Sequence, residues 1–239
     1  MRQAISVQNA GVHFSIRRSL FRKDIIPALR DVSFNLYHGD SLGIIGRNGA
    51  GKTTLLRLLC GIIRPDSGKI IINNNLKVTM LSLQVGFEPA LTGRVNAILS
   101  GMLLGYHKCE VIANLDKIIE FAELGDFIDK PVQTYSSGMK ARLGFAVALR
   151  LSPDVLLIDE VLGVGDAEFR KKSMAVMKKK LLSDQTIVLV SHSAATVKEL
   201  CNRAVWIEKG RSIMEGNVDE VIGAYENFFA KKSRQAVNR

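Results

Sequence analysis

The sequence predicts an α/β fold in which a sheet with an antiparallel β edge carries an inserted helical subdomain. Short apolar strand patterns alternate with helical patterns near both ends of the chain, whereas the middle is helical. A glycine-rich segment stands directly between a buried strand and a leucine-rich helix. We expect one domain over 1–239, with a core of 1–83 and 152–217, a helical subdomain of 84–151, and a C-terminal helix and basic tail of 218–239.

The composition is that of a compact folded chain. Hydrophobic residues make up 47% of the 239 residues, which is enough for a buried core. The longest uncharged, largely apolar stretch, Val95–Tyr106, is too short to span a bilayer, so we expect it to be packed core. The first residues lead into a strand pattern rather than a secretory signal, which predicts a cytosolic protein.

The net charge of +10 does not by itself indicate a partner, because the basic residues are scattered. The group Arg170–Lys180 falls on an expected helix whose packed face would include Met174 and Met177. This arrangement favours a solvated helix face over a binding patch, and we expect no nucleic-acid partner. The isolated cysteines are expected to be buried, reduced thiols: Cys60, Cys109 and Cys201.

The first part of the chain is expected to form the sheet edge and one central strand. Apolar residues alternate from Ile5 to Val7 and from Val12 to Ile16, with a break at Gly11. A basic insertion, Arg17–Lys23, follows. Further along we expect strands Ala28–Leu36, Ser41–Ile45 and Lys69–Ile72, helix Thr53–Cys60 and a turn at Pro65–Gly68.

The rest of the chain is expected to supply the helical insert and then to return to strands. The expected helices are Glu110–Glu123, Met139–Arg150 and Val218–Ala230, and the expected strands are Val155–Ile158, Thr186–Val190 and Ala204–Ile207. The last helix would pack through an apolar stripe of Val221, Ile222, Tyr225, Phe228 and Phe229.

The segment Gly46–Thr53 fits the phosphate-loop pattern GxxxxGK(S/T), directly after a strand and directly before a helix. Glycines let backbone N–H groups wrap a phosphate, and the helix N-terminus adds positive potential. Lys52 would reach the β- and γ-phosphates of ATP, and the Thr53 hydroxyl would coordinate Mg²⁺. The motif predicts a P-loop NTPase (RecA-like) core, with these nucleotide contacts: Gly46, Asn48, Gly49, Gly51, Lys52, Thr53 and Thr54.

The buried strand Val155–Ile158 ends in two acids, which is the pattern of a Walker B strand. Asp159 at the carboxyl end of the strand can hold Mg²⁺, and Glu160 is placed to polarise an attacking water. Many buried strands end in an acid, so the pattern alone is weak evidence. It indicates a Walker B strand here because the same chain also contains a phosphate loop.

The segment Tyr135–Lys140 resembles the ABC signature Leu-Ser-Gly-Gly-Gln, with tyrosine, serine and methionine at three positions. It would form a second anion site from the Ser136 hydroxyl, Ser137, the Gly138 N–H and a helix N-terminus. In isolation the serine would be read as a simple helix cap. Its order between the phosphate loop and the Walker B strand favours the anion site.

The ABC resemblance implies four further contacts. Asp166 matches the D-loop aspartate, and His192 matches the switch histidine that touches the γ-phosphate. Gln84 matches the Q-loop glutamine, a contact to nucleotide and Mg²⁺, although its spacing to Leu91 differs by about one residue. Phe14 sits where the family places an aromatic that stacks on adenine, with His13 as a possible substitute and an ordinary core phenylalanine as the alternative.

Within the ABC superfamily the chain resembles the polysaccharide and lipopolysaccharide O-antigen exporter ATPases, close to the capsule and teichoic-acid exporters. The segments that carry this resemblance are Gly86–Arg94, Tyr135–Met139, Asp159–Asp166 and the basic insertion. The resemblance implies an ATPase with ATP and Mg²⁺ as cofactors, working as a head-to-tail homodimer with a second copy of itself. It also implies docking on two copies of a multi-spanning membrane permease, at the cytoplasmic face of the bacterial inner membrane.

Two other classes stay open from the sequence. An importer ATPase of the same superfamily would change direction and substrate but not the ATP chemistry. A soluble ABC ATPase of DNA repair, iron–sulfur assembly or translation is the other class, although this chain has neither a long coiled-coil insert nor two cassettes. Few residues follow Gly216, far fewer than a carbohydrate-binding β-sandwich needs, so we expect no direct glycan binding by this subunit.

Overall fold

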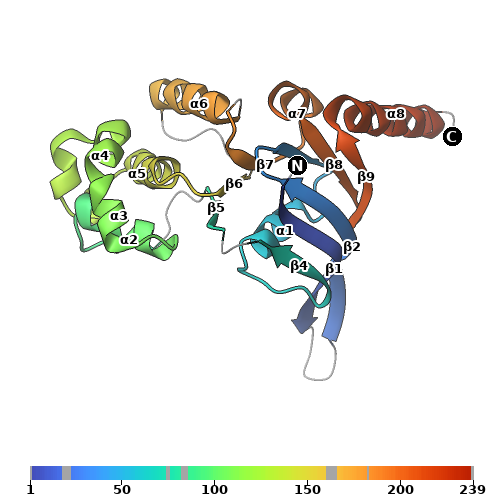
Figure 1. Ribbon diagram of the computed structural model, residues 1–239, viewed down its shortest axis with the longest axis horizontal. Coiled ribbons are helices and arrows are strands. Elements are labelled where there is room, and N and C mark those ends of the chain that lie inside the picture. Colours follow the sequence, from blue (N-terminus) through green and yellow to red (C-terminus); the bar gives the residue numbers. More distant parts are fainter. Residues whose placement is uncertain are drawn as a thin grey trace. The chain divides into compact units, whose positions relative to one another are not determined.

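The computed structural model describes residues 2–17, 23–73, 76–81, 86–159, 166–181 and 183–237 (Figure 1). The chain divides into two compact units. The first comprises Met1–Leu76, Leu157–Glu160 and Lys180–Arg239, and the second comprises Lys77–Leu156 and Val161–Lys179. The second unit therefore extends past both ends of the 84–151 segment that the sequence suggested for the helical subdomain.

The first unit is built on a mixed sheet with the strand order β4-β1-β2-β9-β8-β3-β7-β6. Strand β6 contributes its last two residues to this unit. The strands are β1 Gln3–Arg17, β2 Lys23–Tyr37, β3 Ser41–Ile45, β4 Ser67–Ile72, β6 Val155–Ile158, β7 Thr186–Ser191, β8 Arg203–Glu208 and β9 Arg211–Asn217. Strand β3 is parallel to β7 and β8, whereas β1 is antiparallel to β2 and β4. This confirms the antiparallel edge beside a parallel core.

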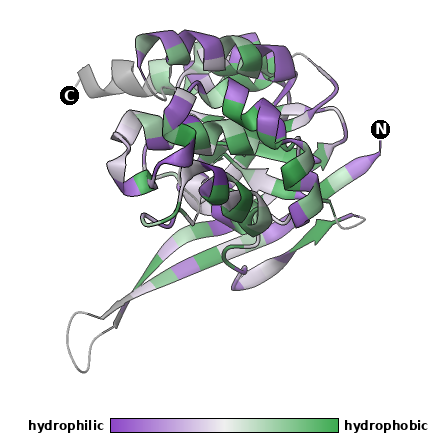
Figure 2. Ribbon diagram, turned by 90° about the vertical axis from the view of Figure 1, so that its left-hand side faces the viewer, coloured by the Kyte–Doolittle hydropathy of each residue, from purple (hydrophilic) through white to green (hydrophobic). Residues whose placement is uncertain are grey.

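Strand β1 is one continuous strand, so the predicted break at Gly11 is wrong. The register between β1 and β2 shifts on either side of Ala10, and Asn9 has a φ of +50°. A bulge of this kind adds a residue and bends the strand without ending it. Along the β1–β2 hairpin, hydrophobic and hydrophilic residues alternate, as expected for strands with two different faces (Figure 2).

Three helices pack on the sheet of the first unit: α1 Lys52–Leu59, α7 Ala194–Leu200 and α8 Val218–Val237. Helices α7 and α8 lie side by side in Figure 1, with α1 on the other side of the strands. A Cβ at Gly43 would meet Val197 at 2.3 Å, so the glycine lets α7 sit close to β3. Helix α8 is longer than predicted, and Tyr225, Phe228 and Phe229 surround Trp206 of β8.

The second unit is mainly helical. Its elements are strand β5 Val78–Met80, helices α2 Gly93–Leu103, α3 Lys108–Ala113, α4 Leu115–Ala122, α5 Ser137–Arg150 and α6 Ala167–Leu181, and short 3₁₀ turns at Gly125–Asp129 and Val132–Thr134. Its core contains Phe121, Phe145 and Phe169 from three helices, with ring centres 5.6 to 6.1 Å apart. The rings contact in stacked and edge-to-face arrangements that aromatic pairs favour.

Two details of the helical prediction are wrong. Glu110–Glu123 is two helices, because Asn114 ends α3 and its side-chain amide donates to the Glu110 carbonyl at 2.9 Å. On α6 the packed face is Phe169, Ser173, Met177 and Leu181, whereas Met174 is 39% exposed. The buried positions follow a spacing of four residues, which leaves Lys171, Lys178 and Lys179 exposed.

The cysteine prediction holds for one position only. Cys201 is buried, and burial raises the pKa of its thiol to about 12, whereas Cys60 is half-buried and Cys109 is exposed.

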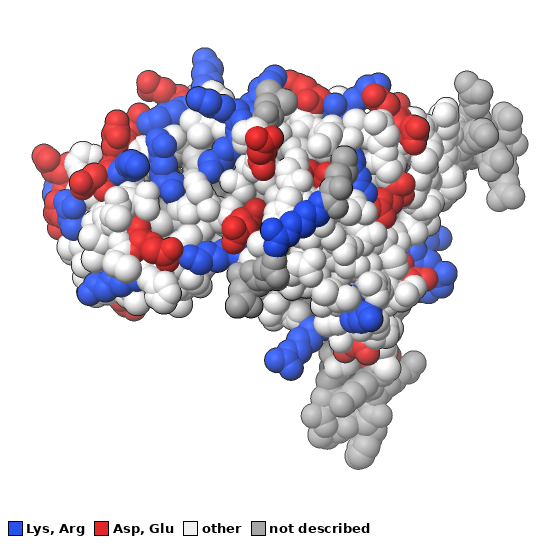
Figure 3. All heavy atoms as spheres, viewed as in Figure 1, with Lys and Arg blue, Asp and Glu red and all other residues white. Residues whose placement is uncertain are grey.

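Lys and Arg side chains are interspersed with Asp and Glu over the face shown in Figure 3. Among the residues that the structure describes, no helix is both long and apolar enough to cross a membrane.

Candidate functional site

The phosphate-loop segment follows β3 and leads into α1. Strands β3 and β7 are parallel with Ile45 opposite Ser191, so the loop begins beside the residue that follows β7. Gly49 and Gly51 have φ of +79° and +103°, values that glycine adopts without strain. A Cβ at Gly46 would meet the Ile207 carbonyl oxygen at 2.2 Å. The glycines at these positions are thus required by the path of the loop.

Lys52 is the first residue of α1, and its ammonium group lies inside the loop. Its Nζ donates to the carbonyl oxygens of Gly46 at 2.7 Å and Arg47 at 3.0 Å. Burial lowers the pKa of Lys52, and the charge of the Asp159 carboxylate opposes that shift. A bound phosphate could take over these hydrogen bonds and would also restore the preference for the charged amine.

Thr53 and Asp159 come from α1 and from the end of β6, and their side chains are bonded. The Thr53 hydroxyl donates to the Asp159 carboxylate at 3.2 Å. Hydroxyl and carboxylate oxygens are the ligands that Mg²⁺ prefers, and Mg²⁺ commonly completes its coordination with water and phosphate oxygens. The donor set at this position therefore fits Mg²⁺.

A pocket of about 450 Å³ opens beside these residues. Its lining joins the phosphate loop, the start of α1 and a piece of β2: Ile26, Pro27, Ala28, Asn48, Gly49, Gly51, Lys52, Thr53, Thr54 and Asp159. The pocket is polar at the phosphate loop and apolar at β2, which suits a ligand with a charged end and a flat apolar end.

Phe14 is not in the pocket lining itself, but it is the cross-strand neighbour of Ile26 at the apolar end. It pairs with Ile26, so the two side chains share one face of the hairpin, and Phe14 is 43% exposed rather than core. His13 is engaged elsewhere, since its backbone N–H donates to Asp66 at 2.6 Å and its Nδ1 is 3.5 Å from the same carboxylate. This arrangement favours Phe14 over His13 as the residue that stacks on a base.

We expect Phe14→Ala to weaken nucleotide binding several-fold while the melting temperature stays nearly unchanged. Stacking of an aromatic side chain on a base contributes about 1–3 kcal/mol, and removal of an exposed ring leaves little cavity. Fluorescent-nucleotide titration and thermal melting measure the two quantities. Ile25→Ala is the matched control, because Ile25 is an exposed apolar residue of β2, the partner strand, where it pairs with Ser15 next to Phe14. A large fall in melting temperature with unchanged affinity would favour a structural role for the ring.

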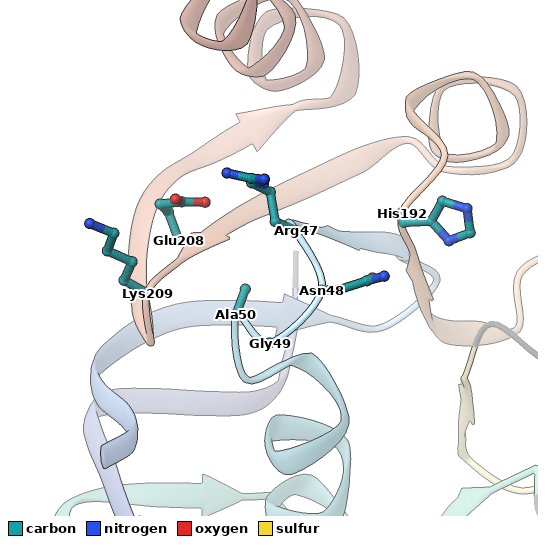
Figure 4. A pocket seen from close by; sticks show the side chains of 7 residues that line it. All are labelled: Arg47, Asn48, Gly49, Ala50, His192, Glu208 and Lys209. Atoms are coloured by element: carbon teal, nitrogen blue, oxygen red, sulfur yellow. The ribbon is translucent and has the colours of Figure 1, made fainter. Parts of the chain in front are cut away.

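A second pocket, of about 470 Å³, shares Asn48 and Gly49 with the first (Figure 4). It is lined by Arg47, Asn48, Gly49, Ala50, His192, Glu208 and Lys209. In Figure 4 the Asn48 side chain extends on the side of the loop that faces His192, while Arg47 extends toward Glu208. The structure therefore brings His192, which follows β7, to the phosphate loop.

The signature segment lies in the second unit, at the start of α5. Ser136 is the N-cap, and its Oγ accepts a hydrogen bond from the Met139 N–H at 3.1 Å. A Cβ at Gly138 would meet nothing nearer than the Ser136 hydroxyl at 3.7 Å, so the packing of the chain itself does not require a glycine there. Ser136 therefore caps α5, and Gly138 leaves the backbone at the N-terminus of this helix uncovered.

Ser136, Gly138 and Asp166 line one pocket of about 460 Å³. Its other lining residues are Glu123, Leu124, Phe127, Met139 and Arg142, whereas Ser137 is exposed and is not part of the lining. The Asp166 carboxylate accepts a hydrogen bond from the Phe169 N–H at 2.9 Å and pairs with Arg142. These two bonds lower the pKa of Asp166, so it carries a negative charge at neutral pH.

A family model described as "ABC transporter" matches residues 29–163, more than half of the chain. The chain belongs to this family. The match runs from β2 through the phosphate loop and the signature segment to the Walker B strand.

Curated relatives from the ABC family carry export names. The O-antigen export system ATP-binding protein RfbB of Myxococcus xanthus is 46% identical over 212 residues, covering 89% of this chain and 48% of that protein. The protein of the same name from Klebsiella pneumoniae is 43% identical over 203 residues, covering 85% of this chain and 82% of that protein. The chain thus spans about half the length of the Myxococcus relative.

Solved ABC structures confirm the α/β fold with a P-loop core. A dimeric ATP-binding cassette in a post-hydrolysis state, bound to ADP and Pi, matches with a TM-score of 0.70. That match covers 90% of this chain and 98% of the cassette. Because the two sequences are only 23% identical, the match is evidence for the fold and not for a shared role.

Several pocket residues of this ABC chain were not found by sequence reasoning. Ile26, Pro27 and Ala28 reach the first pocket, and Glu208 and Lys209 reach the second, through strand pairing that no local motif encodes. Arg142 follows the signature serine on the same helix, and its position one turn past Met139 could have indicated it. The predicted contacts Gln84 and Glu160 lie outside the described residues.

Proposed function

We propose that the chain is the ATP-binding and ATP-hydrolysing subunit of a bacterial exporter of lipid-linked polysaccharide, acting as a head-to-tail homodimer. The observation that carries the proposal is the presence of two separate anion-binding arrangements, the phosphate loop in one unit and the signature segment in the other. The export names of the relatives favour polysaccharide as the cargo.

In this proposal each site residue has its own task. Lys52 exchanges its two loop carbonyls for phosphate oxygens, and Phe14 stacks on adenine. Thr53 and Asp159 would hold Mg²⁺, which neutralises phosphate charge when it is bound. Glu160 follows Asp159 and is assigned the task of orienting water, with His192 beside the phosphate loop as a γ-phosphate contact.

The proposal requires a second copy for hydrolysis. The signature serine and Gly138 of one copy would contact the nucleotide held by the phosphate loop of the other, so a monomer lacks half of the donors around the γ-phosphate. ATP would therefore act as the bridge of the dimer, and its hydrolysis would release the two copies. Two copies of a membrane permease at the cytoplasmic face of the inner membrane would couple this cycle to export.

The test is ATPase activity of the purified protein with Mg²⁺, compared with Lys52→Met. We expect the variant to be slower by about 10²-fold or more, because it loses the cation that faces the phosphates. Lys117→Met, an exposed lysine of α4, is the matched control and should behave as wild type. Wild-type hydrolysis no faster than that of Lys52→Met would overturn the enzymatic part of the proposal.

The cargo is tested in cells. A strain lacking the ATPase of an O-antigen exporter should regain surface polysaccharide when it receives this gene together with its neighbouring permease gene. Lys52→Met should fail to restore it. Continued absence of surface polysaccharide, with both introduced proteins present in the cells, would contradict polysaccharide as the cargo.

A further inference from the structure

Four charged side chains from three helices meet beside the signature pocket. Glu123 ends α4, Arg142 lies one turn into α5, and Asp166 and Lys172 stand before and within α6. Three of the four also line the pocket that contains Ser136 and Gly138. All belong to the second unit.

Arg142 is the centre of this cluster. Its guanidinium pairs with the Asp166 carboxylate, and its Nη1 lies 3.8 Å from the Glu123 carboxylate. The guanidinium carbon is 5.0 Å from the centre of the Phe169 ring. The Arg142 side chain is 18% exposed, whereas both carboxylates are about half exposed. A planar cation held between an aromatic ring and two carboxylates has few alternative positions.

Glu123 gives a second, independent observation. Its φ of +51° and ψ of +47° place it in the left-handed region that glycine favours, yet the residue is glutamate. Its carboxylate accepts a hydrogen bond from Lys172, which also donates to the Phe121 carbonyl at 3.2 Å. At this position, which ends α4, the Glu123 carboxylate contacts both Lys172 and Arg142.

We propose that Arg142 is a positioning residue that joins Asp166 to the signature helix, so that the signature loop and Asp166 are presented as one surface. The inference rests on the proposed function. Asp166 is held from two sides, by the Phe169 N–H of its own helix and by Arg142 of α5. Arg142 acts through Asp166, and Glu123 with Lys172 fixes Arg142 from the opposite side.

The proposal predicts a specific change in kinetics. Arg142→Ala should lower kcat about 10- to 100-fold, since misplacing a group by about 1 Å costs that much. The KM for ATP should change less than about twofold, because the phosphate loop lies in the other unit and keeps its contacts. Arg142→Lys keeps the charge but not the two-pronged geometry, so it should recover part of the lost rate.

A double-mutant cycle separates positioning from general stabilisation. If Arg142 acts through Asp166, then Arg142→Ala with Asp166→Ala should be no slower than the slower single variant. Arg94→Ala is the matched control, because it removes an arginine–carboxylate pair, with Asp129, away from the pocket. It should leave kcat unchanged. Where Arg142→Ala does not fold, as judged by thermal melting, Arg142→Lys replaces it in the same cycle.

A lower kcat with near-constant KM, and a non-additive cycle, support the assignment. An unchanged kcat, a rise in KM alone, or rate losses that multiply in the double variant would overturn it. Failure of the proposed function would look different, because wild type itself would then hydrolyse ATP no faster than Lys52→Met.

Discussion

Replacement of Glu160 with glutamine should lower ATP hydrolysis by about 10²- to 10⁴-fold while ATP binding persists. Glutamine keeps the shape of the side chain and its capacity for hydrogen bonds, but it cannot act as the carboxylate that orients and polarises water. The phosphate-loop contacts of Lys52 and Thr53 are unaffected. ATP should then remain between two copies, and the dimer should persist.

Size-exclusion chromatography of this variant with ATP and Mg²⁺ measures the dimer directly. The expected result is a dimer that requires ATP and disappears with ADP. Glu160→Gln combined with Lys52→Met is the control, since it removes the cation that holds the nucleotide and should remain a monomer. A monomer at high protein concentration, with ATP demonstrably bound, would contradict the sandwich arrangement.

The elements that the sequence predicted well are those whose whole environment is the core. Strands β3, β6 and β7 are buried at every position, so an uninterrupted apolar run identifies each of them. The phosphate loop was equally clear, because its glycines, lysine and threonine each meet a local requirement of the backbone or the ligand. At these positions the residue type needed for the backbone conformation or for ligand binding can be read from the adjacent sequence alone.

The features that were missed depend on packing between distant segments. The bulge at Asn9 is a matter of register between β1 and β2, and alternation alone reads it as a strand end. The Gly210 N–H donates to the Ala50 carbonyl at 3.1 Å, which places the β8–β9 turn against the phosphate loop. Nothing in either segment predicts the other, so the second pocket could not be assembled from motifs.

The same reasoning applies to the signature pocket. Ser136 and Gly138 were found from their motif, whereas Arg142 and Glu123 join them only because α4, α5 and α6 pack around Phe121, Phe145 and Phe169. The expected helix pattern also missed Phe169 and assigned the exposed Met174, beside the buried Met177, to the packed face of α6. The packing of the three phenylalanines therefore determines that Arg142 and Glu123 lie at the signature pocket.

The second unit carries an exposed apolar surface that should decide coupling to a membrane partner. Leu91, Val95, Met102 and Leu103 are exposed along α2 and the segment before it, with Leu103 at 63%. The preceding segment is fixed to α2, because Asn96 accepts from the Glu88 N–H at 2.6 Å and donates to the Glu88 carbonyl at 3.0 Å. The loop expected around Leu91 therefore ends at Thr92, which caps α2.

We predict that Phe87→Asp abolishes export in cells and spares the ATPase activity of the purified protein. Phe87 is half-buried and follows Gly86, where an added Cβ would meet Leu103 of this surface. A carboxylate at position 87 would have to lose its water when an apolar permease helix docks. Hydrolysis needs the phosphate loop and the signature pocket, whose lining does not include Phe87. Surface polysaccharide and ATP turnover measure the two effects separately.

Ile213→Asp is the matched control for this prediction, because Ile213 is an exposed apolar residue of β9 in the first unit. It should support normal export, which shows that an added surface carboxylate does no harm in itself. Export that survives Phe87→Asp would place the permease contact elsewhere. Loss of ATPase activity in the purified Phe87→Asp protein would instead show that the ring supports the fold, since docking plays no part in that measurement.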